Sequence, residues 1–196
     1  LILFFSDSEN FRKKIFPEYK GHRNRKKPCG YRKVISQLAE RYEVIRLPEL
    51  EADDAMGIYA TANVGNIICS PDKDMRQIPG KLYDMKEVHT IDPEEGAKWH
   101  LIQTLAGDQT DGYSGVPGIG VKRAVSLFEE HGYTWKTVVK AFEEKDLTEE
   151  DALLNARLAR ILTYTDYDPI EHTVIPWNPD ANYRADNGAI IQAEKA

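Results

Sequence analysis

The sequence is poor in cysteine and histidine and has no long apolar run. Its two cysteines, Cys29 and Cys69, have neither the pairing pattern of a disulfide scaffold nor metal-ligand spacing, so both are expected to be free thiols. The five histidines are scattered, which argues against a zinc site. No apolar run approaches the roughly 20 residues that span a bilayer, and the apolar start LILFF is too short and lacks the basic flank of a signal peptide. We therefore expect a soluble, cytoplasmic protein with no membrane partner.

Acidic residues outnumber basic ones, but the two kinds are unevenly distributed. The net charge of the chain is -6. Residues 1–33 carry ten Lys or Arg and three acids, a net charge of +7, whereas residues 34–196 carry 16 bases and 29 acids, a net charge of -13. A basic arm beside an acidic body is expected where the arm binds phosphates and the body binds cations. A solvated, disordered basic loop is the alternative that charge alone leaves open.

Apolar periodicity predicts an α/β half followed by a helical half. A chain of 196 residues with 41% hydrophobic content can bury one core and a small second lobe. Buried strands are predicted at 1–5 and 66–70, and further strands at 44–47, 81–85 and 88–91. Helices are predicted at 31–42, 51–62, 93–106, 121–131, 135–144 and 148–164. Strands that alternate with helices indicate a mainly parallel sheet. From Asp166 onward, prolines and polar residues predict a loose tail. Because Leu1 already lies in a predicted strand, we expect a further segment upstream of it.

Eight acids fall in four short clusters at predicted strand ends and helix starts. They are Asp7, then Glu51, Asp53 and Asp54, then Asp72 and Asp74, then Asp108 and Asp111. In isolation, an acidic first helix turn or turn-forming aspartates explain such clusters better than a functional site does. Their co-occurrence in one chain favours a shared site, because ligands bind beyond the carboxyl ends of parallel strands, where Asp7 and Asp72 are expected.

So many carboxylates in one cleft would repel one another unless cations were bound there. Oxygen ligands without a histidine or cysteine cluster favour Mg²⁺ or Mn²⁺. Two such ions in one site are the arrangement that cleaves phosphodiester bonds.

A glycine-rich turn, Gly115-Val-Pro-Gly-Ile-Gly120, opens a basic helix. Gly118 and Gly120 let the backbone approach a phosphate, and the helix N-terminus supplies free N–H donors beside Lys122 and Arg123. This arrangement is typical of helix-hairpin-helix elements, which hold a DNA backbone without reading bases. The turn lacks the GK[ST] pattern of a Walker loop and does not follow a strand, as a dinucleotide fingerprint should. An ordinary helix-helix turn remains the alternative.

Four ordered segments carry a resemblance to the 5′-nuclease superfamily, and specifically to the bacteriophage 5′-3′ exonucleases and flap endonucleases. They are FFSDSENFRKKIFPEYKGHR, EADD, SPDKD and GDQTDGYSGVPGIGVKRA, and the resemblance extends from residue 1 to about residue 177. It implies a PIN-like α/β domain with a helical arch and a helix-three-turn-helix lobe. It also implies Mg²⁺-dependent removal of nucleotides or short flaps from DNA 5′ ends, with RNA-DNA hybrids as further substrates. For a phage protein, the setting would be DNA replication or degradation in the host cytoplasm.

The resemblance also implies roles for individual residues. Glu51, Asp53 and Asp72 resemble ligands of a first metal ion, and Asp74, Asp108 and Asp111 resemble the acids that serve a second. Asp7 matches the carboxylate after the second core strand, and Asp54 is expected to act through water. Lys20 and Arg23 resemble a basic pair that contacts and polarises the scissile phosphate, with Tyr19 stacked on an unpaired base. Further DNA contacts are expected from Arg25, Lys26, Lys27, Gly115, Gly118, Ile119, Gly120, Lys122 and Arg123, and the turn resembles one that binds K⁺ through backbone carbonyls.

On this basis we expect a nuclease core over residues 1–92 with a short basic arch at about 10–33, a helical lobe over 93–177 and a tail over 178–196. The family's first strand supplies an aspartate, and no such strand precedes Leu1. An upstream segment or a separate chain would then complete the sheet. Three hypotheses remain open: a 5′-nuclease, a DNA-binding relative whose catalysis is impaired, and a PIN-type ribonuclease.

Overall fold

The computed structural model describes residues 1–23, 28–63 and 65–179. Arg25, Lys26 and Lys27, which were predicted to contact DNA, lie outside these ranges, as does nearly all of the predicted tail. No helix within the described ranges is long and apolar enough to cross a membrane.

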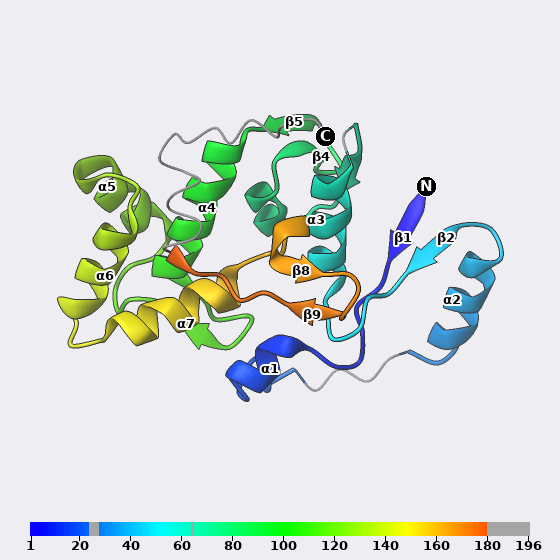
Figure 1. Ribbon diagram of the computed structural model, residues 1–196, viewed down its shortest axis with the longest axis horizontal. Coiled ribbons are helices and arrows are strands. Elements are labelled where there is room, and N and C mark those ends of the chain that lie inside the picture. Colours follow the sequence, from blue (N-terminus) through cyan, green and yellow to red (C-terminus); the bar gives the residue numbers. More distant parts are fainter. Residues whose placement is uncertain (24–27, 64, 180–196) are drawn as a thin grey trace.

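The first half of the chain forms two small sheets with parallel strands, as predicted. Strand β1 (Ile2–Phe4) pairs in parallel with β2 (Glu43–Ile45). In the second sheet, β3 (Ile67–Cys69) pairs in parallel with β4 (Gly80–Tyr83), which pairs antiparallel with β5 (Val88–Ile91). Helix α3 (Ala52–Ala62) contacts both β1 and β3, and Figure 1 shows it at the centre of the molecule. The predicted α/β class is therefore confirmed.

The prediction that the first strand is buried is wrong. Leu1 is 82% exposed and Ile2 is 38% exposed. Within the described residues, β1 has β2 as its one strand neighbour, so its other edge and part of its side chains face outward. Ile67 of β3 is 50% exposed for the same reason, because among the described residues β3 has β4 as its one strand neighbour.

The basic arm contains two short helices, α1 (Phe11–Ile15) and α2 (Tyr31–Ala39). Helix α2 ends three residues before the predicted Tyr42. It has no fully buried residue and lies at the edge of the molecule beside β2 (Figure 1). Its apolar stripe is therefore only partly covered.

The helical lobe follows the prediction closely. It comprises α4 (Pro93–Ala106), a hairpin of β6 (Gly107–Asp108) and β7 (Tyr113–Ser114), α5 (Val121–His131), α6 (Trp135–Glu143) and α7 (Glu149–Ala159). Its core is formed by side chains from all four helices. The predicted start of α7 is a capping box, in which Thr148 and Asp151 satisfy each other's backbone N–H groups. The division into domains remains a prediction.

Helix α7 ends at Ala159, five residues earlier than predicted, because buried polar side chains bind the backbone that follows it. The Gln77 amide donates to the Ala159 carbonyl at 2.7 Å and its carbonyl oxygen accepts from Ile161 N at 3.0 Å. Arg12 donates to the Arg160 carbonyl at 2.5 Å. These long-range contacts compete with the next helical turn, and Arg160 takes an extended conformation.

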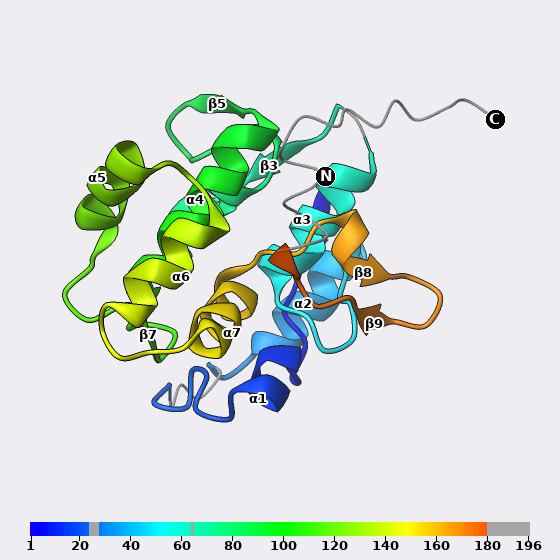
Figure 2. The ribbon, with the colours of Figure 1, turned by 60° about the vertical axis from the view of Figure 1, so that its left-hand side comes forward.

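The segment after α7, where the sequence predicted a loose tail that wraps or frays from Asp166 onward, wraps onto the protein. It forms a single turn, η2 (Tyr164–Asp166), and a hairpin of β8 (Tyr167–Asp168) and β9 (Thr173–Val174), which Figure 2 shows beside α3. Trp177 is buried and meets His100 and Trp135 edge to face. Apolar side chains among the prolines therefore anchor this segment.

Buried His100 predicts a loss of stability in mild acid. Burial, assisted by Arg160, lowers its pKa to about 3, against the weaker opposite effects of Asp166 and of the Ala156 carbonyl. The unfolded chain then binds more protons than the folded one between pH 6.5 and about 3, so stability falls as the pH falls through this window. From pH 7.5 to 5.0 the loss due to His100 should be about 2 kcal/mol. Urea unfolding of wild type and of His100→Gln at both pH values isolates the contribution of His100 to the free energy of unfolding. An equal pH dependence in the two proteins would refute this prediction.

Candidate metal and nucleic-acid site

Seven of the eight predicted acids line one cavity of about 340 Å³. The cavity also receives Lys20 and Arg23 of the basic arm. The seven acids are Glu51, Asp53, Asp54, Asp72, Asp74, Asp108 and Asp111. Clusters that lie up to 60 residues apart in the sequence are thus brought together.

The ends of secondary-structure elements position these acids. Glu51 is the N-cap of α3, and Asp53 lies in the first turn of that helix. Asp72 follows β3 and caps the short helix η1 (Lys73–Gln77) by accepting a hydrogen bond from Asp74 N at 2.9 Å. Asp108 ends β6, and Asp111 lies in the turn between β6 and β7. The carboxyl end of a parallel strand and the start of a helix therefore face the β6–β7 turn, a hairpin that the sequence did not predict.

Asp7 does not join the site. It follows β1, as predicted, but its carboxylate accepts a hydrogen bond from Glu49 N at 2.9 Å and does not border the cavity. This backbone contact is the main reason that its pKa is lowered. The structure thus gives Asp7 a role in holding the loop before α3.

Asp54 borders the cavity but is not available as a ligand. Its side chain is 1% exposed, and both oxygens accept from the Arg12 guanidinium, at 2.7 and 2.8 Å. They also accept from Leu162 N at 3.2 Å and Glu51 N at 3.2 Å. The expectation that Asp54 acts on a metal through water is therefore replaced by a structural role beneath the site.

Arg12 is the residue that sequence reasoning missed. It is 3% exposed, and besides Asp54 it binds the carbonyls of Leu158 and Arg160 and lies 3.5 Å from Glu51. In the sequence it is one of ten bases in the arm, and nothing local distinguishes it from its exposed neighbours Lys13 and Lys14. It connects α1 to α3 and to the end of α7.

The basic arm places two further cations on two of the acids. Lys20 Nζ lies 2.5 Å from Glu51 Oε1 and 3.4 Å from Asp111 Oδ2. Arg23 binds the other oxygen of Asp111 at 2.6 Å. A backbone hydrogen bond also joins the arm to the β6–β7 turn, because Lys20 N donates to the Asp111 carbonyl at 2.7 Å. Burial alone would raise the pKa of Glu51, but Arg12 and Lys20 hold it below its ordinary value.

The other acids have no such compensation. Within the described part of the chain, Asp53, Asp72, Asp74 and Asp108 make no ion pair. Burial, followed by the charge of Asp72, raises the pKa of Asp53 to about 7 and that of Asp74 to about 6. Asp74 Oδ1 is buried without a hydrogen-bond partner. Carboxylate oxygens that have no cation paired with them are suitable ligands for hard divalent cations.

Tyr19 cannot stack on a base as predicted. Its side chain is 2% exposed and packs with Tyr113 and Leu158. Its hydroxyl lies 2.9 Å from both Glu51 Oε2 and Asp111 Oδ2. Burial raises its pKa further above neutrality, so the hydroxyl keeps its proton and acts as a donor.

The glycine-rich turn presents part of the predicted surface. Gly118, Gly120, Lys122 and Arg123 are exposed where α5 begins. Gly115 has a structural role in the turn, because a Cβ atom at this position would lie 2.2 Å from the Leu105 carbonyl oxygen. Ile119 packs against the lobe core, so only its backbone remains for a phosphate. Arg123 donates to the Gly118 carbonyl at 3.0 Å, which engages one of the carbonyls expected to bind K⁺.

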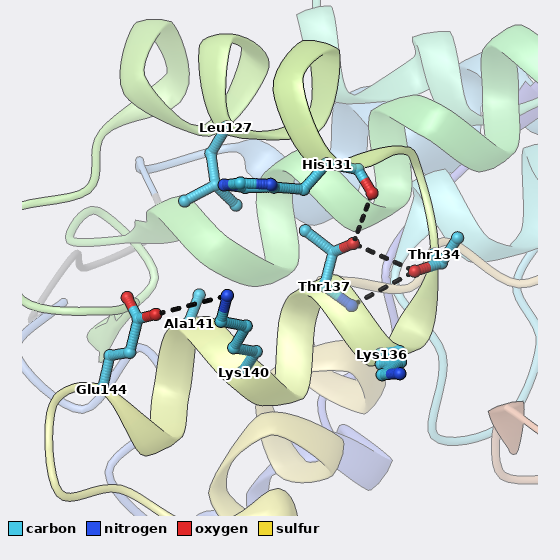
Figure 3. A pocket seen from close by; sticks show the side chains of 8 residues that line it. All are labelled: Leu127, His131, Thr134, Lys136, Thr137, Lys140, Ala141 and Glu144. Atoms are coloured by element: carbon cyan, nitrogen blue, oxygen red, sulfur yellow. Dashed lines mark hydrogen bonds and ion pairs between the residues drawn. The ribbon is translucent and has the colours of Figure 1, made fainter.

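A second hollow, of about 250 Å³, lies between α5 and α6 and has a different character (Figure 3). Two threonines line it at the start of α6, and the hydroxyl oxygens of Thr134 and Thr137 lie 3.0 Å apart. Its one carboxylate, Glu144, faces Lys140 at 3.9 Å. This hollow has no group of uncompensated acids and is not a second metal site.

A sequence comparison identifies the family. The model of the 5′-3′ exonuclease N-terminal resolvase-like domain matches residues 1–100. The chain belongs to this family. The exonuclease of Escherichia phage T7 is 32% identical over 91% of this chain and 74% of its own length. The exodeoxyribonuclease of Enterobacteria phage T3 is 31% identical over 91% of this chain and 73% of its own length.

A solved structure supports the fold. The bacteriophage T5 flap endonuclease, in a complex with DNA and metal ions, matches with a TM-score of 0.60 at 19% identity, over 81% of this chain and 72% of the other. At this identity the likeness concerns the fold, and it agrees with the predicted PIN-like architecture.

Proposed function

We propose that this protein is a structure-specific 5′-nuclease that hydrolyses DNA phosphodiester bonds at 5′ ends or 5′ flaps with two Mg²⁺ or Mn²⁺ ions. The observation that carries the proposal is the cavity in which four acids lack an ion pair while Lys20 and Arg23 lie at its side. The phage exonucleases to which the chain is similar support the same activity. They give no support to the alternative of a relative with impaired catalysis.

The acids divide between two ions in the proposal. Glu51, Asp53 and Asp72 would hold the first, and Asp74, Asp108 and Asp111 the second, whereas Asp7 and Asp54 leave the ligand set. Bound together, two such ions supply a hydroxide nucleophile and stabilise the attacking and leaving oxygens. The chain itself supplies the cavity in which these carboxylates, most of them partly buried, are held close together before any ion arrives.

Lys20 and Arg23 would bind the scissile phosphate. Lys20 pairs with Glu51 and Asp111, Arg23 pairs with Asp111, and the two bases are 18% and 35% exposed at the cavity. Because both are partly exposed, the two side chains would be able to turn to the phosphate without crossing a packed core. The same groups thus stabilise the site before substrate binds and position the substrate afterwards.

Replacing Lys20 by alanine should lower turnover much more than DNA affinity. Loss of one positive charge at the developing negative charge of the transition state should reduce kcat by about 100-fold. The Kd for a flap duplex should change less than threefold, because many other phosphate contacts remain. Lys14→Ala is the matched control, since Lys14 also pairs with a glutamate, Glu49, but on the outer face of α1. An unchanged kcat in Lys20→Ala would remove Lys20 from this role.

The exposed turn at Gly118–Gly120, with Lys122 and Arg123, would hold the duplex part of the substrate through its backbone. K⁺ at this turn, RNA-DNA hybrids as substrates, and a place in phage DNA replication or degradation in the host cytoplasm belong to the same proposal.

The direct test is cleavage of a 5′-labelled flap duplex with Mg²⁺ and with a chelator. We expect metal-dependent release of the flap or of 5′ nucleotides. Binding of the duplex without any product at saturating Mg²⁺ would overturn the proposal for this chain.

A further inference from the structure

Tyr19 has an unusual place in this site. Its ring is buried among Phe16, Tyr113 and Leu158, so it has little freedom to move. Its hydroxyl is the one part that reaches the acids, where it lies 2.9 Å from Glu51 Oε2 and 2.9 Å from Asp111 Oδ2. A single oxygen atom therefore touches two carboxylates.

These two carboxylates come from different parts of the fold. Glu51 caps α3, which packs on the sheets, and Asp111 lies in the β6–β7 turn, which leaves the end of α4. Among the described residues, the side chains that contact both acids are Tyr19 and Lys20. The Lys20 side chain is 18% exposed at the cavity, whereas the ring that carries the tyrosine hydroxyl is held by its packing.

We propose that Tyr19 is a positioning residue whose hydroxyl holds Glu51 and Asp111 at a fixed separation, and so couples the two halves of the metal site. This inference rests on the proposed two-metal function. The hydroxyl has one proton, which it can give to one carboxylate at a time, and in this structure the Lys20 ammonium contacts both acids and offsets the remaining repulsion. When Lys20 turns to the substrate, Tyr19 keeps the acids in place.

The inference predicts how the chain binds metal without any substrate. Hydrogen bonds that orient metal ligands typically contribute about 10- to 100-fold to metal affinity. In Tyr19→Phe the ring still fills its pocket, but the hydroxyl that contacts Glu51 and Asp111 is lost. We expect wild type to bind two Mn²⁺ ions per chain, and we expect the weaker of the two to bind at least about tenfold more weakly in Tyr19→Phe.

Calorimetric titration with MnCl₂ in the absence of DNA measures this effect, with thermal unfolding of each protein to show that it is folded. Tyr113→Phe is the control, because Tyr113 stacks on Tyr19 at 6.5 Å and its hydroxyl makes no hydrogen bond within the described residues. It should keep both affinities within about twofold. In addition, kcat of Tyr19→Phe should fall while KM for DNA stays the same.

The outcomes are distinct. Wild-type Mn²⁺ affinities in Tyr19→Phe would overturn the inference and leave the proposed function intact. An equal loss in Tyr113→Phe would also overturn it, since the effect would then come from packing. A wild-type protein that binds no Mn²⁺ would overturn the two-metal function itself, and the inference with it.

Discussion

Asp72→Asn should abolish cleavage and leave the fold and DNA binding intact. Asp72 follows β3 and faces both Asp53 and Asp74, whose pKa values are raised first by burial and next by its charge. Asparagine removes that charge, and with it one ligand of the first ion. The rate on a flap duplex should fall at least about 1000-fold, since the lost ligand weakens both metal binding and charge stabilisation in the transition state.

The same change should preserve the local backbone. Asp72 Oδ1 caps η1 by accepting from Asp74 N, and the asparagine carbonyl can accept the same bond. Removal of a repulsive neighbour should leave the metal-free protein at least as stable as wild type in urea unfolding at neutral pH. A stability loss together with the activity loss would show that Asp72 is needed for the fold and not for a metal.

Asp92→Asn is the matched control. Asp92 is also an N-cap, accepting from Glu95 N at 2.7 Å at the start of α4, but it does not border the cavity. It should cleave at the wild-type rate. Gel shift of the flap duplex in Ca²⁺ or chelator checks that both variants still bind. Retained cleavage by Asp72→Asn, or loss of binding with cleavage intact, would contradict the proposed site.

The parts of this fold that the sequence predicted are those governed by local chemistry. The acids of α3 and the cap residue Thr148 mark helix starts because side-chain oxygens must satisfy free N–H groups there. The shared site was predicted from acid clusters at strand ends and helix starts, but of the two acids that the strand-end rule itself placed there, Asp72 lines the cavity and Asp7 does not.

The parts that the sequence did not predict depend on partners far along the chain. The sequence does not distinguish Asp54 from its neighbour Asp53. Arg12, 42 residues away, makes Asp54 its buried partner, whereas Asp53 stays in the cavity. The early end of α7 depends on Gln77, 82 residues away. The family resemblance implied that Tyr19 stacks on a base, yet its ring turns inward and packs against Phe16 and Tyr113. No local pattern distinguishes these cases.

Arg12→Met should destabilise the protein by about 3 to 5 kcal/mol. The substitution leaves Asp54 as a buried charge without a cation, and it leaves the carbonyls of Leu158 and Arg160 without a donor. Methionine fills much of the volume, so the loss measures the missing charge and hydrogen bonds more than a cavity. Urea unfolding at pH 7.5 measures it, and Lys13→Met, exposed on the same helix, should change stability by less than about 0.5 kcal/mol.

A second substitution separates the buried charge from the rest of the network. In Arg12→Met with Asp54→Asn, the amide oxygen can still accept from Leu162 N, but no uncompensated charge remains. The double variant should recover at least about 1 kcal/mol relative to Arg12→Met alone. If the single variant lost less than about 1 kcal/mol, Asp54 would have to be solvated or protonated in its place. The carboxylate would then face the cavity, and Asp54 would return to the set of candidate metal ligands.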